Sequence, residues 1–452
     1  MSTRDTMPPN SSLPPAPLRF RVIYGVYQLA IHALLPLVLL GFLWKSRKEP
    51  LYRKGFAARF GLAPKSTAGR VLVFATSLGE TRAASPLIRE LLNNGHDVYL
   101  AHNTPAGMVA GQGLFEEDIA TGRVVQSYMA ADLFWVLWLF YLRQKFKAVL
   151  VIENELWPAM LTEARRLSLP IFEINSSFAE ASLQRNKTRL GGYLLWLWTR
   201  FTGITTKSPK HIARFLTAGV EEERLHNVGE LRFDMPLDER KRKAAISLRE
   251  RGYFGTHKVL MIASSVEAEE DDLLAYLREV IANCPAVTVI WVPRSPQRFD
   301  AVYKKCLEIS VNTAKRSDAF SADFVERGDA PQILVGDSLG EMDFYYALSD
   351  LMFVGATIAD HGGHNVIEPL AHQKPVLTGP SIWGILFPAE DAIEAGVQFR
   401  AQDVAELTQE TCRLLQSKAA LTKMQRATDG FNDTHMGAAA RTYALLAPFL
   451  QA

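Results

Sequence analysis

Residues 71–80 read VLVFATSLGE and decide the fold, because an unbroken apolar strand ends there in a polar turn and leads into a helical pattern that runs to about Leu92. Similar runs in the first half are VYLAHN (98–103), AVLVIE (148–153), PIFEIN (170–175), GITTK (203–207) and a short strand near 227–229. A second series comprises KVLMIAS (258–264), AVTVIWVPR (286–294), QILVG (332–336), DLMFVG (350–355) and PVLTG (375–379). Apolar strands separated by helices are typical of parallel sheets covered on both faces. The sequence therefore predicts an α/β protein with two Rossmann-like domains facing a cleft, joined by the charged segment 238–251.

The composition is that of an ordinary globular protein and excludes several classes. The chain has 452 residues, of which 48% are hydrophobic, and its 50 Lys and Arg against 48 Asp and Glu leave a formal charge of +2. This balance excludes a nucleic-acid binder held by bulk positive charge. The three cysteines have neither the spacing of a zinc site nor that of a disulfide framework. Function must therefore be sought in the motifs.

Residues 22–44 contain no formal charge and are flanked by basic residues. A helix over this stretch would be about 35 Å long, enough to cross a hydrocarbon core of about 30 Å. We therefore expect a membrane anchor helix over 22–44 after a flexible tail over 1–21, with a helix lying in the membrane interface as the alternative. Basic residues are more numerous after the stretch than before it, which predicts that the body of the protein is cytoplasmic.

Two aromatic segments also bear on the membrane. LFWVLWLFYL (133–142) and YLLWLWTRF (193–201) both place tryptophans beside basic residues. Aromatic side chains next to cations suit the lipid headgroup zone. Core helices of an α/β domain have the same composition, so both interpretations remain open.

Polar residues follow several strands, where open α/β sheets bind their ligands. Glu80 comes at the start of the helix after the first strand, and it is either a first-turn acid favoured by the helix dipole or a general base. Glu153 and Glu155 follow the 148–153 strand, and one of this pair is expected to be only a helix cap. The first half thus supplies candidate site acids at two strand ends.

The second half carries motifs suited to phosphate. Arg294 ends a strand, where a cation can hold a phosphate, and Gly362 and Gly363 would let the backbone approach a phosphate at a helix N-terminus. Glu368, one turn after His364, would accept hydrogen bonds from ribose hydroxyls. His361 and His364 lack a third ligand at useful spacing, so we expect no metal site. The acidic run 267–272 is interpreted as a solvated helix start.

With these motifs, the chain resembles the 3-deoxy-D-manno-octulosonic acid (Kdo) transferases, the inner-membrane enzymes of lipopolysaccharide assembly. The likeness runs from about residue 24 to about residue 440. It is carried by RKEPLYRKGFAARFG, SLGETRAASPLI, IENELWPAML, VGELRFD, VPRSPQRF, GDSLGEMDFYYALSDLMFVG and HGGHNVIEPLAHQKPVLTGP. The resemblance implies a GT-B fold with an acceptor domain over 45–235, a nucleotide-sugar domain over 236–427 and a C-terminal helix over 428–452 that packs back across the domains.

The resemblance also implies roles for individual residues. Glu80 matches the family's catalytic base. Glu153 matches an acid, and Arg232 stands where the family usually has a lysine; both are implied to assist the transition state. The residues implied to hold CMP are Pro293, Arg294, Leu339, Gly340, Glu341, Asn365, Val366, Ile367 and Glu368. The implied reaction is an inverting transfer of Kdo from CMP-Kdo to a lipid A precursor, without metal or cofactor. The implied partners are a CMP-activated sugar donor, a lipid acceptor and the bacterial inner membrane, with the catalytic body on its cytoplasmic side and no nucleic acid.

Four positions depart from the family pattern. Basic or imidazole side chains usual in the family are replaced by Ser177, Val266, Ser295 and Ser381. These losses keep three alternatives open. The first is a paralogue using another CMP-activated ulosonic acid or envelope acceptor, the second is a non-catalytic GT-B protein that binds nucleotide or lipid, and the third is an epimerase acting on UDP-sugars.

Overall fold

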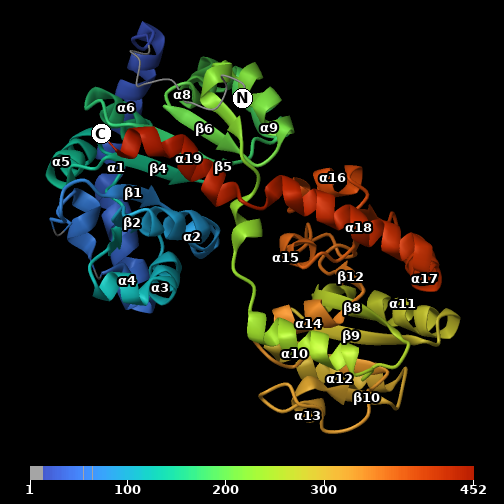
Figure 1. The fold of residues 1–452 in the computed structure, drawn as a ribbon. Coiled ribbons are helices and arrows are strands. Elements are labelled where there is room, and N and C mark those ends of the chain that lie inside the picture. The colour runs from blue at the N-terminus through green and yellow to red at the C-terminus, as the bar shows by residue number, and fades with distance from the viewer. Residues whose placement is uncertain (1–13, 54, 64, 452) are drawn as a thin grey trace. The chain divides into compact units, whose positions relative to one another are not determined.

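The computed structural model describes residues 14–53, 55–63 and 65–451. The chain forms two compact units (Figure 1). The N-terminal unit comprises the chain up to Met235 together with the segment from His435 onward, and the C-terminal unit comprises Pro236–Thr434. Each unit is built on its own parallel sheet of seven strands. The predicted α/β class with two Rossmann-like sheets is therefore confirmed.

In the N-terminal unit the strand order is β3-β2-β1-β4-β5-β6-β7, and every pair is parallel. The strands are β1 (Val71–Phe74), β2 (Val98–His102), β3 (Val124–Tyr128), β4 (Ala148–Ile152), β5 (Ile171–Ser176), β6 (Gly203–Thr206) and β7 (Leu225–Asn227). Its helices are α1 (Leu18–Lys48), α2 (Leu78–Asn93), α3 (Pro105–Leu114), α4 (Glu116–Ala120), α5 (Phe134–Gln144), α6 (Pro158–Arg166), α7 (Glu180–Thr188), α8 (Tyr193–Trp198), α9 (Pro209–Thr217) and α19 (Ala438–Leu450). Two separate core clusters of buried hydrophobic residues form in this unit.

In the C-terminal unit the order is β10-β11-β9-β8-β12-β13-β14, again all parallel. The strands are β8 (Lys258–Ser265), β9 (Val287–Pro293), β10 (Thr313–Lys315), β11 (Ile333–Val335), β12 (Leu351–Val354), β13 (Val376–Thr378) and β14 (Gln398–Arg400). The helices are α10 (Glu239–Glu250), α11 (Glu270–Asn283), α12 (Phe299–Leu307), α13 (Arg316–Ala319), α14 (Met342–Leu348), α15 (Ile367–Ala371), α16 (Leu386–Glu394), α17 (Val404–Gln416) and α18 (Lys418–His435). The strand order reverses at β1/β4 in the first sheet and at β8/β12 in the middle of the second, and ligands of such sheets bind beyond the strand ends at this point.

Several boundaries differ from the sequence expectations. The charged segment 238–251 is not a linker, because it forms α10, which packs on α14. The C-terminal helical stretch begins ten residues early and is broken: α18 starts at Lys418, and Gly437, with a φ of 81°, separates it from α19. Helix α19 packs on α2 within the N-terminal unit.

Helix α1 starts inside the expected tail, because Phe20 is buried against Tyr193 and Trp196. Residues 1–13 of that tail lie outside the described part of the chain. Among the residues that the structure describes, α1 is the one helix with the length and apolar composition needed to cross a membrane.

Helix α1 lies along the N-terminal unit over most of its length. Tyr27 donates a hydrogen bond to Asp132 at 2.8 Å, Gln28 Nε2 donates to the Asp132 carbonyl at 3.1 Å, and Trp135 donates to His32 at 3.0 Å. Farther along, the Phe42 ring lies 6.0 Å from that of Tyr52. One face of the helix is therefore fixed to the body by polar and aromatic contacts. Large apolar side chains elsewhere on the helix are exposed, namely Val22, Val26, Leu29, Leu34, Leu37, Val38, Leu40 and Leu43.

The two aromatic segments differ from one another. Val136, Leu137, Phe140 and Tyr141 of α5 are buried, whereas Phe134, Trp135, Trp138 and Leu142 are exposed by about 40% each. In residues 193–201 the side chains of Tyr193, Leu195, Leu197, Trp198 and Phe201 are all buried. The second segment is therefore mostly a core element, with Trp196 partly buried beside Arg200, and the first presents the larger aromatic surface.

Candidate functional site

The reversal point of the N-terminal sheet brings Glu80 and Glu153 to the same edge. Glu80 lies in the first turn of α2, directly after β1, and Glu153 directly follows β4, the strand next to β1. Parallel strands end at one edge of their sheet, so the two carboxylates that the sequence placed separately occur side by side in the topology.

Glu80 is held by its own helix start. Its Oε2 accepts hydrogen bonds from the Ser77 backbone N–H at 2.6 Å and from the Thr76 hydroxyl, and Ser77 completes a capping box. The first-turn interpretation is thus correct, because the side chain satisfies helix donors. A carboxylate has a second oxygen, however, and no described residue is hydrogen-bonded to Oε1 of Glu80. The cap fixes the orientation of the group and leaves Oε1 available.

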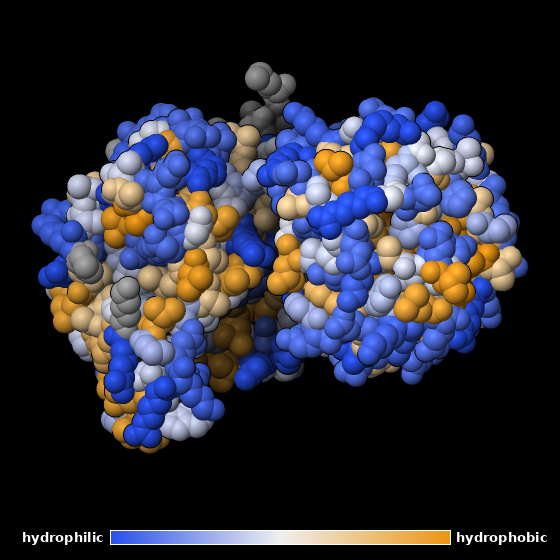
Figure 2. Space-filling model, turned by 90° about the horizontal axis from the view of Figure 1, so that it is seen from below, coloured by the Kyte–Doolittle hydropathy of each residue, from blue (hydrophilic) through white to orange (hydrophobic). Residues whose placement is uncertain are grey.

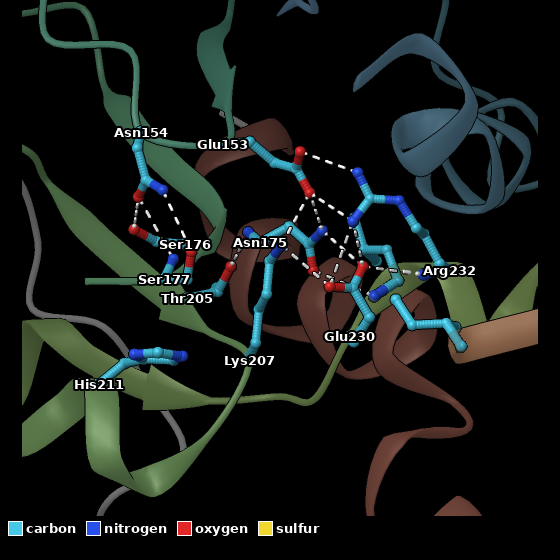
Figure 3. A network of polar contacts seen from close by, with 12 residues as sticks. Glu153, Asn154, Asn175, Ser176, Ser177, Thr205, Lys207, His211, Glu230 and Arg232 are labelled. Atoms are coloured by element: carbon cyan, nitrogen blue, oxygen red, sulfur yellow. Dashed lines mark hydrogen bonds and ion pairs between the residues drawn. The ribbon is translucent and has the colours of Figure 1, made fainter. Parts of the chain in front are cut away.

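Glu153 and Arg232 form a bidentate ion pair at this edge (Figure 3). The two guanidinium nitrogens Nη1 and Nη2 lie 2.9 Å from Oε1 and Oε2 of Glu153, respectively. Lys207, at the end of β6, places its Nζ 2.8 Å from Glu153 and 2.9 Å from Glu230. Arg232 also lies 3.4 Å from Glu230, so each of the two cations contacts both carboxylates in four ion pairs. The bidentate Arg232–Glu153 contact is the strong form of charged hydrogen bonding.

Asn175 joins this network from β5. Its Nδ2 donates to Glu153 at 3.0 Å and to Glu230 at 2.8 Å, and its Oδ1 accepts the Leu231 N–H at 3.1 Å. Glu153, Asn154 and Asn175 all have φ between 59° and 69°, a left-handed conformation that costs energy in residues other than glycine. The surrounding hydrogen bonds offset this cost, and the side chains are held in a defined arrangement.

Charge and burial set the protonation of the network. Burial alone would raise the pKa of Glu153, but Lys207 and Arg232 bring it down to about 2. Burial alone would lower the pKa of Arg232, but the charges of Glu230, Glu153 and Glu80 raise it above its usual value. Burial raises the pKa of Glu155, and the charge of Glu80 raises it further. Glu80 and Arg232 therefore interact electrostatically, which ties the expected base to the ion-pair network.

Sequence reasoning missed Lys207 and Glu230. Lys207 is 6% exposed and Glu230 is fully buried, and each is paired within the network. The signal for Lys207 was its place at the end of GITTK, directly after β6. Glu155 instead accepts a hydrogen bond from the Trp157 indole at 2.8 Å, so it lies outside the network.

In the C-terminal unit, Arg294 is exposed at the end of β9, and its side chain makes no ion pair with any residue that the structure describes. Burial lowers the pKa of His364, and the nearby charges of Arg294 and His361 lower it further. Arg294 and the two histidines therefore lie in one neighbourhood. Pro293 beside Arg294 is buried in its strand. The guanidinium is a cation whose charge no carboxylate of the described chain neutralises.

Of the remaining residues expected to hold CMP, some have polar side chains that are bonded to one another and others are buried. Asn365 Oδ1 accepts the Ile367 N–H at 2.9 Å, and Asn365 Nδ2 donates to Glu368 at 3.1 Å. Glu368 also accepts the Tyr346 hydroxyl at 3.2 Å, which links α15 to α14. Val366 and Ile367 are buried and pack in the core, so their side chains are unavailable to a ligand.

In the segment 339–341, which is also expected to hold CMP, one side chain is exposed and another is already ion-paired. Leu339 is 75% exposed and Gly340 has a φ of 75°. Glu341 forms an ion pair of 2.6 Å with the buried Arg316, so its carboxylate is already neutralised.

The role expected for the two glycines changes in the structure. Gly362 and Gly363 have φ of 81° and 87°, but α15 begins only at Ile367, so they do not form the helix start. A Cβ on Gly362 would lie 2.8 Å from the Trp383 ring, and a Cβ on Gly363 would lie 2.8 Å from Ile385. The close approach that these glycines permit is therefore to the protein's own 383–385 loop.

The acidic run is a solvated helix start only in part: Glu267, Asp271 and Asp272 are exposed, but two of its carboxylates are buried. Glu269 is fully buried and accepts backbone hydrogen bonds from Ala356 at 2.6 Å and Val266 at 3.1 Å. Glu270 is also fully buried and pairs with Arg298 at 2.6 Å. These carboxylates join the loops after β8 and β12, because buried charge must be paired or hydrogen-bonded.

Within residues 14–53, 55–63 and 65–451, no three His, Cys, Asp or Glu side chains are grouped to hold a metal ion. The polar groups at the two sheet edges are thus carboxylates, amides and cations arranged for hydrogen bonding and ion pairing. Such an arrangement can take a proton from a hydroxyl in one unit and can bind an anion in the other.

Comparison with known proteins gives a consistent result. Residues 54–235 match the family model described as 3-deoxy-D-manno-octulosonic-acid transferase (kdotransferase). The chain is 33% identical over 434 residues to the 3-deoxy-D-manno-octulosonic acid transferase of Bordetella pertussis, which covers 94% of this chain and 99% of the relative. It is 27% identical over 428 residues to the Haemophilus influenzae enzyme of the same name, covering 92% and 96%.

Among solved structures, the UDP-GlcNAc 2-epimerase of Neisseria meningitidis bound to UDP-GlcNAc matches with a TM-score of 0.55. The match covers 84% of this chain and 99% of the other at 12% identity, and it shows the fold alone. The two-sheet architecture is therefore GT-B-like, and the sequence relationship sets the family. The chain belongs to the 3-deoxy-D-manno-octulosonic acid transferase family and is a glycosyltransferase.

Proposed function

We propose that this enzyme transfers Kdo from CMP-Kdo to a lipid A precursor, with inversion at the anomeric carbon and without a metal ion. The observation that carries the proposal is the 33% identity to the Bordetella pertussis enzyme over 94% of the chain, since it includes both sheet edges. The coarser statement, Kdo transfer in lipopolysaccharide biosynthesis, follows from the family.

Glu80 acts as the general base in this proposal. Its free Oε1 takes the proton of the acceptor hydroxyl as the hydroxyl oxygen forms a bond to the anomeric carbon. The bond from that carbon to the CMP oxygen breaks at the same time, and CMP leaves with the electron pair. The fixed orientation of Glu80 supports this role, because a positioned base needs no reorganisation during the reaction.

The two sheet edges provide charge stabilisation. Arg294 supplies an unneutralised guanidinium for the phosphate of the departing CMP. Glu153 and Arg232 support the transition state through the network with Lys207 and Glu230, which fixes the position of the Arg232 guanidinium. Asn365 and Glu368, joined to each other, are proposed to contact the nucleotide.

We further propose that the enzyme works on the cytoplasmic face of the bacterial inner membrane, with α1 lying in the interface plane. Contacts to the body run from Phe20 to Phe42, a helical length of about 33 Å. If α1 crossed the bilayer, Asp132 and Trp135 would have to enter the hydrocarbon with it, at a high cost. The exposed apolar side chains of α1 and the basic Lys45, Arg47 and Lys48 suit an anionic membrane surface.

Turnover with CMP-Kdo and a lipid A precursor in mixed micelles tests the proposal. We expect a Kdo-lipid product, inverted anomeric configuration and no loss of rate in EDTA. Absence of product, with release of CMP by hydrolysis only, would contradict it. Preferential binding of UDP over CMP would support the epimerase alternative instead.

A second candidate is transfer of a different CMP-activated ulosonic acid, which the substituted positions favour. Ser381, where the family usually has histidine, donates to Asp360 at 2.8 Å and accepts the Gly362 N–H at 3.1 Å. Ser177 accepts a hydrogen bond from Asn154 Nδ2 at its hydroxyl and donates one from its backbone N–H to Asn154 Oδ1, each at 3.3 Å. Profiling CMP-sugars of differing C5 and C7–C9 substitution separates this candidate, because it requires another sugar to outcompete Kdo.

A further inference from the structure

A pocket of about 660 Å³ lies in the N-terminal unit, between the segment after α1, helix α3 and strand β3. Its lining is mainly apolar: Leu51, Gly55, Ala57, Ala58, Leu62, Met108, Val109, Gln112, Gln126, Ser127 and Tyr128. The volume is in the range of small-molecule sites. Figure 2 shows that hydrophobic residues gather in patches on the surface of the molecule. At this pocket, Leu62 is 54% and Val109 is 60% exposed.

Two polar side chains of the pocket wall are hydrogen-bonded to the protein itself. The Tyr128 hydroxyl donates to the Leu51 carbonyl at 2.9 Å, and Gln126 Nε2 donates to the Met108 carbonyl at 2.8 Å. These groups therefore tie the three walls together. A polar ligand would have to displace these bonds, whereas an apolar ligand would gain by leaving water.

The pocket lies next to the proposed membrane-binding helix. Its first wall, from Leu51 to Leu62, follows α1 directly in the chain. The Arg59 guanidinium lies 4.7 Å from the Phe42 ring on α1 and 4.1 Å from the Tyr128 ring on the pocket wall. One side chain thus separates the pocket from the helix.

The pocket is also connected to Glu80. Thr104, which caps α3, donates from its backbone N–H to the Thr76 carbonyl at 3.1 Å, and Thr76 donates to Glu80. Tyr128 ends β3 and Glu80 follows β1, two strands away in the same sheet. Adjacent strands are about 4.8 Å apart, so the strand that carries Tyr128 and the strand that leads to Glu80 are separated by about 10 Å within the sheet.

We propose that this pocket binds a fatty acyl chain of the lipid acceptor. The inference rests on the proposed function, because the proposed function identifies the acceptor's sugar as the part that reaches Glu80. An acceptor with a sugar headgroup and acyl chains matches the order along the sheet edge: base, hydrogen-bonded turn, apolar pocket, membrane helix. The pocket draws one chain out of the bilayer and thereby fixes the headgroup relative to Glu80.

The first test compares an acylated acceptor with its deacylated headgroup. Leu62→Asp and Val109→Asp place a charge at the rim, and Ala57→Phe fills the pocket while keeping it apolar. Leu216→Asp on α9 is the matched control, since Leu216 is 41% exposed and does not line the pocket. All four positions are exposed, so unchanged thermal unfolding verifies the fold.

We expect all three pocket variants to raise KM for the acylated acceptor about tenfold, with kcat and the KM for the deacylated headgroup unchanged and the control at wild-type values. A rise with the two aspartates but not with Ala57→Phe would indicate lost membrane binding and overturn the pocket assignment. An equal rise for both acceptors would overturn it as well.

A second test does not need turnover. An acceptor lipid with a photoreactive diazirine at the end of an acyl chain is cross-linked to the full chain in micelles, and the labelled peptides are identified. Labelling concentrated in 51–62 and 108–112 is expected, with loss in Ala57→Phe. Labelling confined to α1 would contradict the proposal. If the wild type labels the pocket but transfers no Kdo, the proposed function fails while the acyl site stands.

Discussion

The two sheet edges differ in how their charges are satisfied. At the N-terminal edge, Glu153, Glu230, Lys207 and Arg232 neutralise one another in a network that is complete without a ligand. At the C-terminal edge, Arg294 makes no ion pair with any described residue, while the neighbouring carboxylate of Glu341 is held by Arg316. A preassembled network suits a fixed base and its support, and an unneutralised guanidinium suits an incoming phosphate.

Because of this contrast, we expect substitutions at the two sheet edges to have different effects. The N-terminal network needs four charged side chains and three strained backbone positions in one arrangement. The C-terminal site relies more on loops whose close contacts are made by backbone and glycine. Single substitutions should therefore damage structure and chemistry together on the first edge and affect chiefly ligand binding on the second.

Glu80→Gln should have the largest effect. The amide keeps the shape of the capping side chain but cannot accept a proton, so transfer should fall by about 10³-fold or more while CMP binding stays unchanged. Steady-state turnover and calorimetry with CMP measure the two properties. Glu155→Gln is the control, because Glu155 bonds Trp157 instead. Comparable rates for Glu80→Gln and wild type would remove Glu80 from the base role.

Arg232→Met should damage stability as well as rate. It leaves Glu153 and Glu230 without one of their two cations, and breaking a buried pair costs about 3 kcal/mol or more. Arg232→Lys restores a charge and should recover most of the stability. Urea unfolding of the three proteins checks this expectation. If Met and Lys variants were equally stable, the network would not depend on the guanidinium charge.

Arg294→Ala should change donor affinity more than stability. Losing a charge-assisted bond to phosphate is worth about 2 kcal/mol, or roughly 30-fold in donor KM. Arg294→Lys should recover part of this loss, since it keeps the charge but not the bidentate geometry. Unchanged donor KM in the alanine variant would place the phosphate elsewhere.

The stability of the N-terminal unit should depend on acid through Glu153. Its pKa is about 2 in the folded protein against an ordinary value of 4.5, so the folded form releases the proton more readily. The stabilisation is present above about pH 4.5 and is lost as the pH falls towards 2, with a slope of up to about 1.4 kcal/mol per pH unit. Urea unfolding at pH 4.5 and 3.5 should show this loss, and Glu153→Gln should show a smaller slope. Parallel profiles for both proteins would refute the assignment.

Much of the fold followed from the pattern of apolar strands, and the exceptions have a common cause. The strands that sequence reasoning overlooked are β3, β10 and β14, and each lies at the edge of a sheet. Edge strands are covered less completely and do not need continuous apolar runs, as VVQSY and TAK illustrate. Central strands carry a stronger signal because both their faces are buried.

Site residues could be predicted from the sequence where a charged side chain comes directly after an apolar strand. Glu80 and Glu153 were found in this way, and Arg232 through family resemblance. Glu230 was not, because its partner Asn175 is 55 residues away and only the fold brings them together. The contacts of α1 with the body were likewise hidden, since an apolar stretch has the same composition whether it spans a membrane or packs on a protein. Gln28 and His32, four residues apart, were the signal that one face binds the body.

The division of labour between the two edges is tested most directly by the affinity of CMP for three proteins. Isothermal titration of CMP into wild type, Arg232→Met and Arg294→Ala, each folded at the same temperature, gives one dissociation constant per protein. Wild-type affinity in Arg232→Met together with at least tenfold weaker binding in Arg294→Ala is the result expected. Weaker binding in Arg232→Met with no change in Arg294→Ala would contradict the assignment of acceptor and donor to the two units.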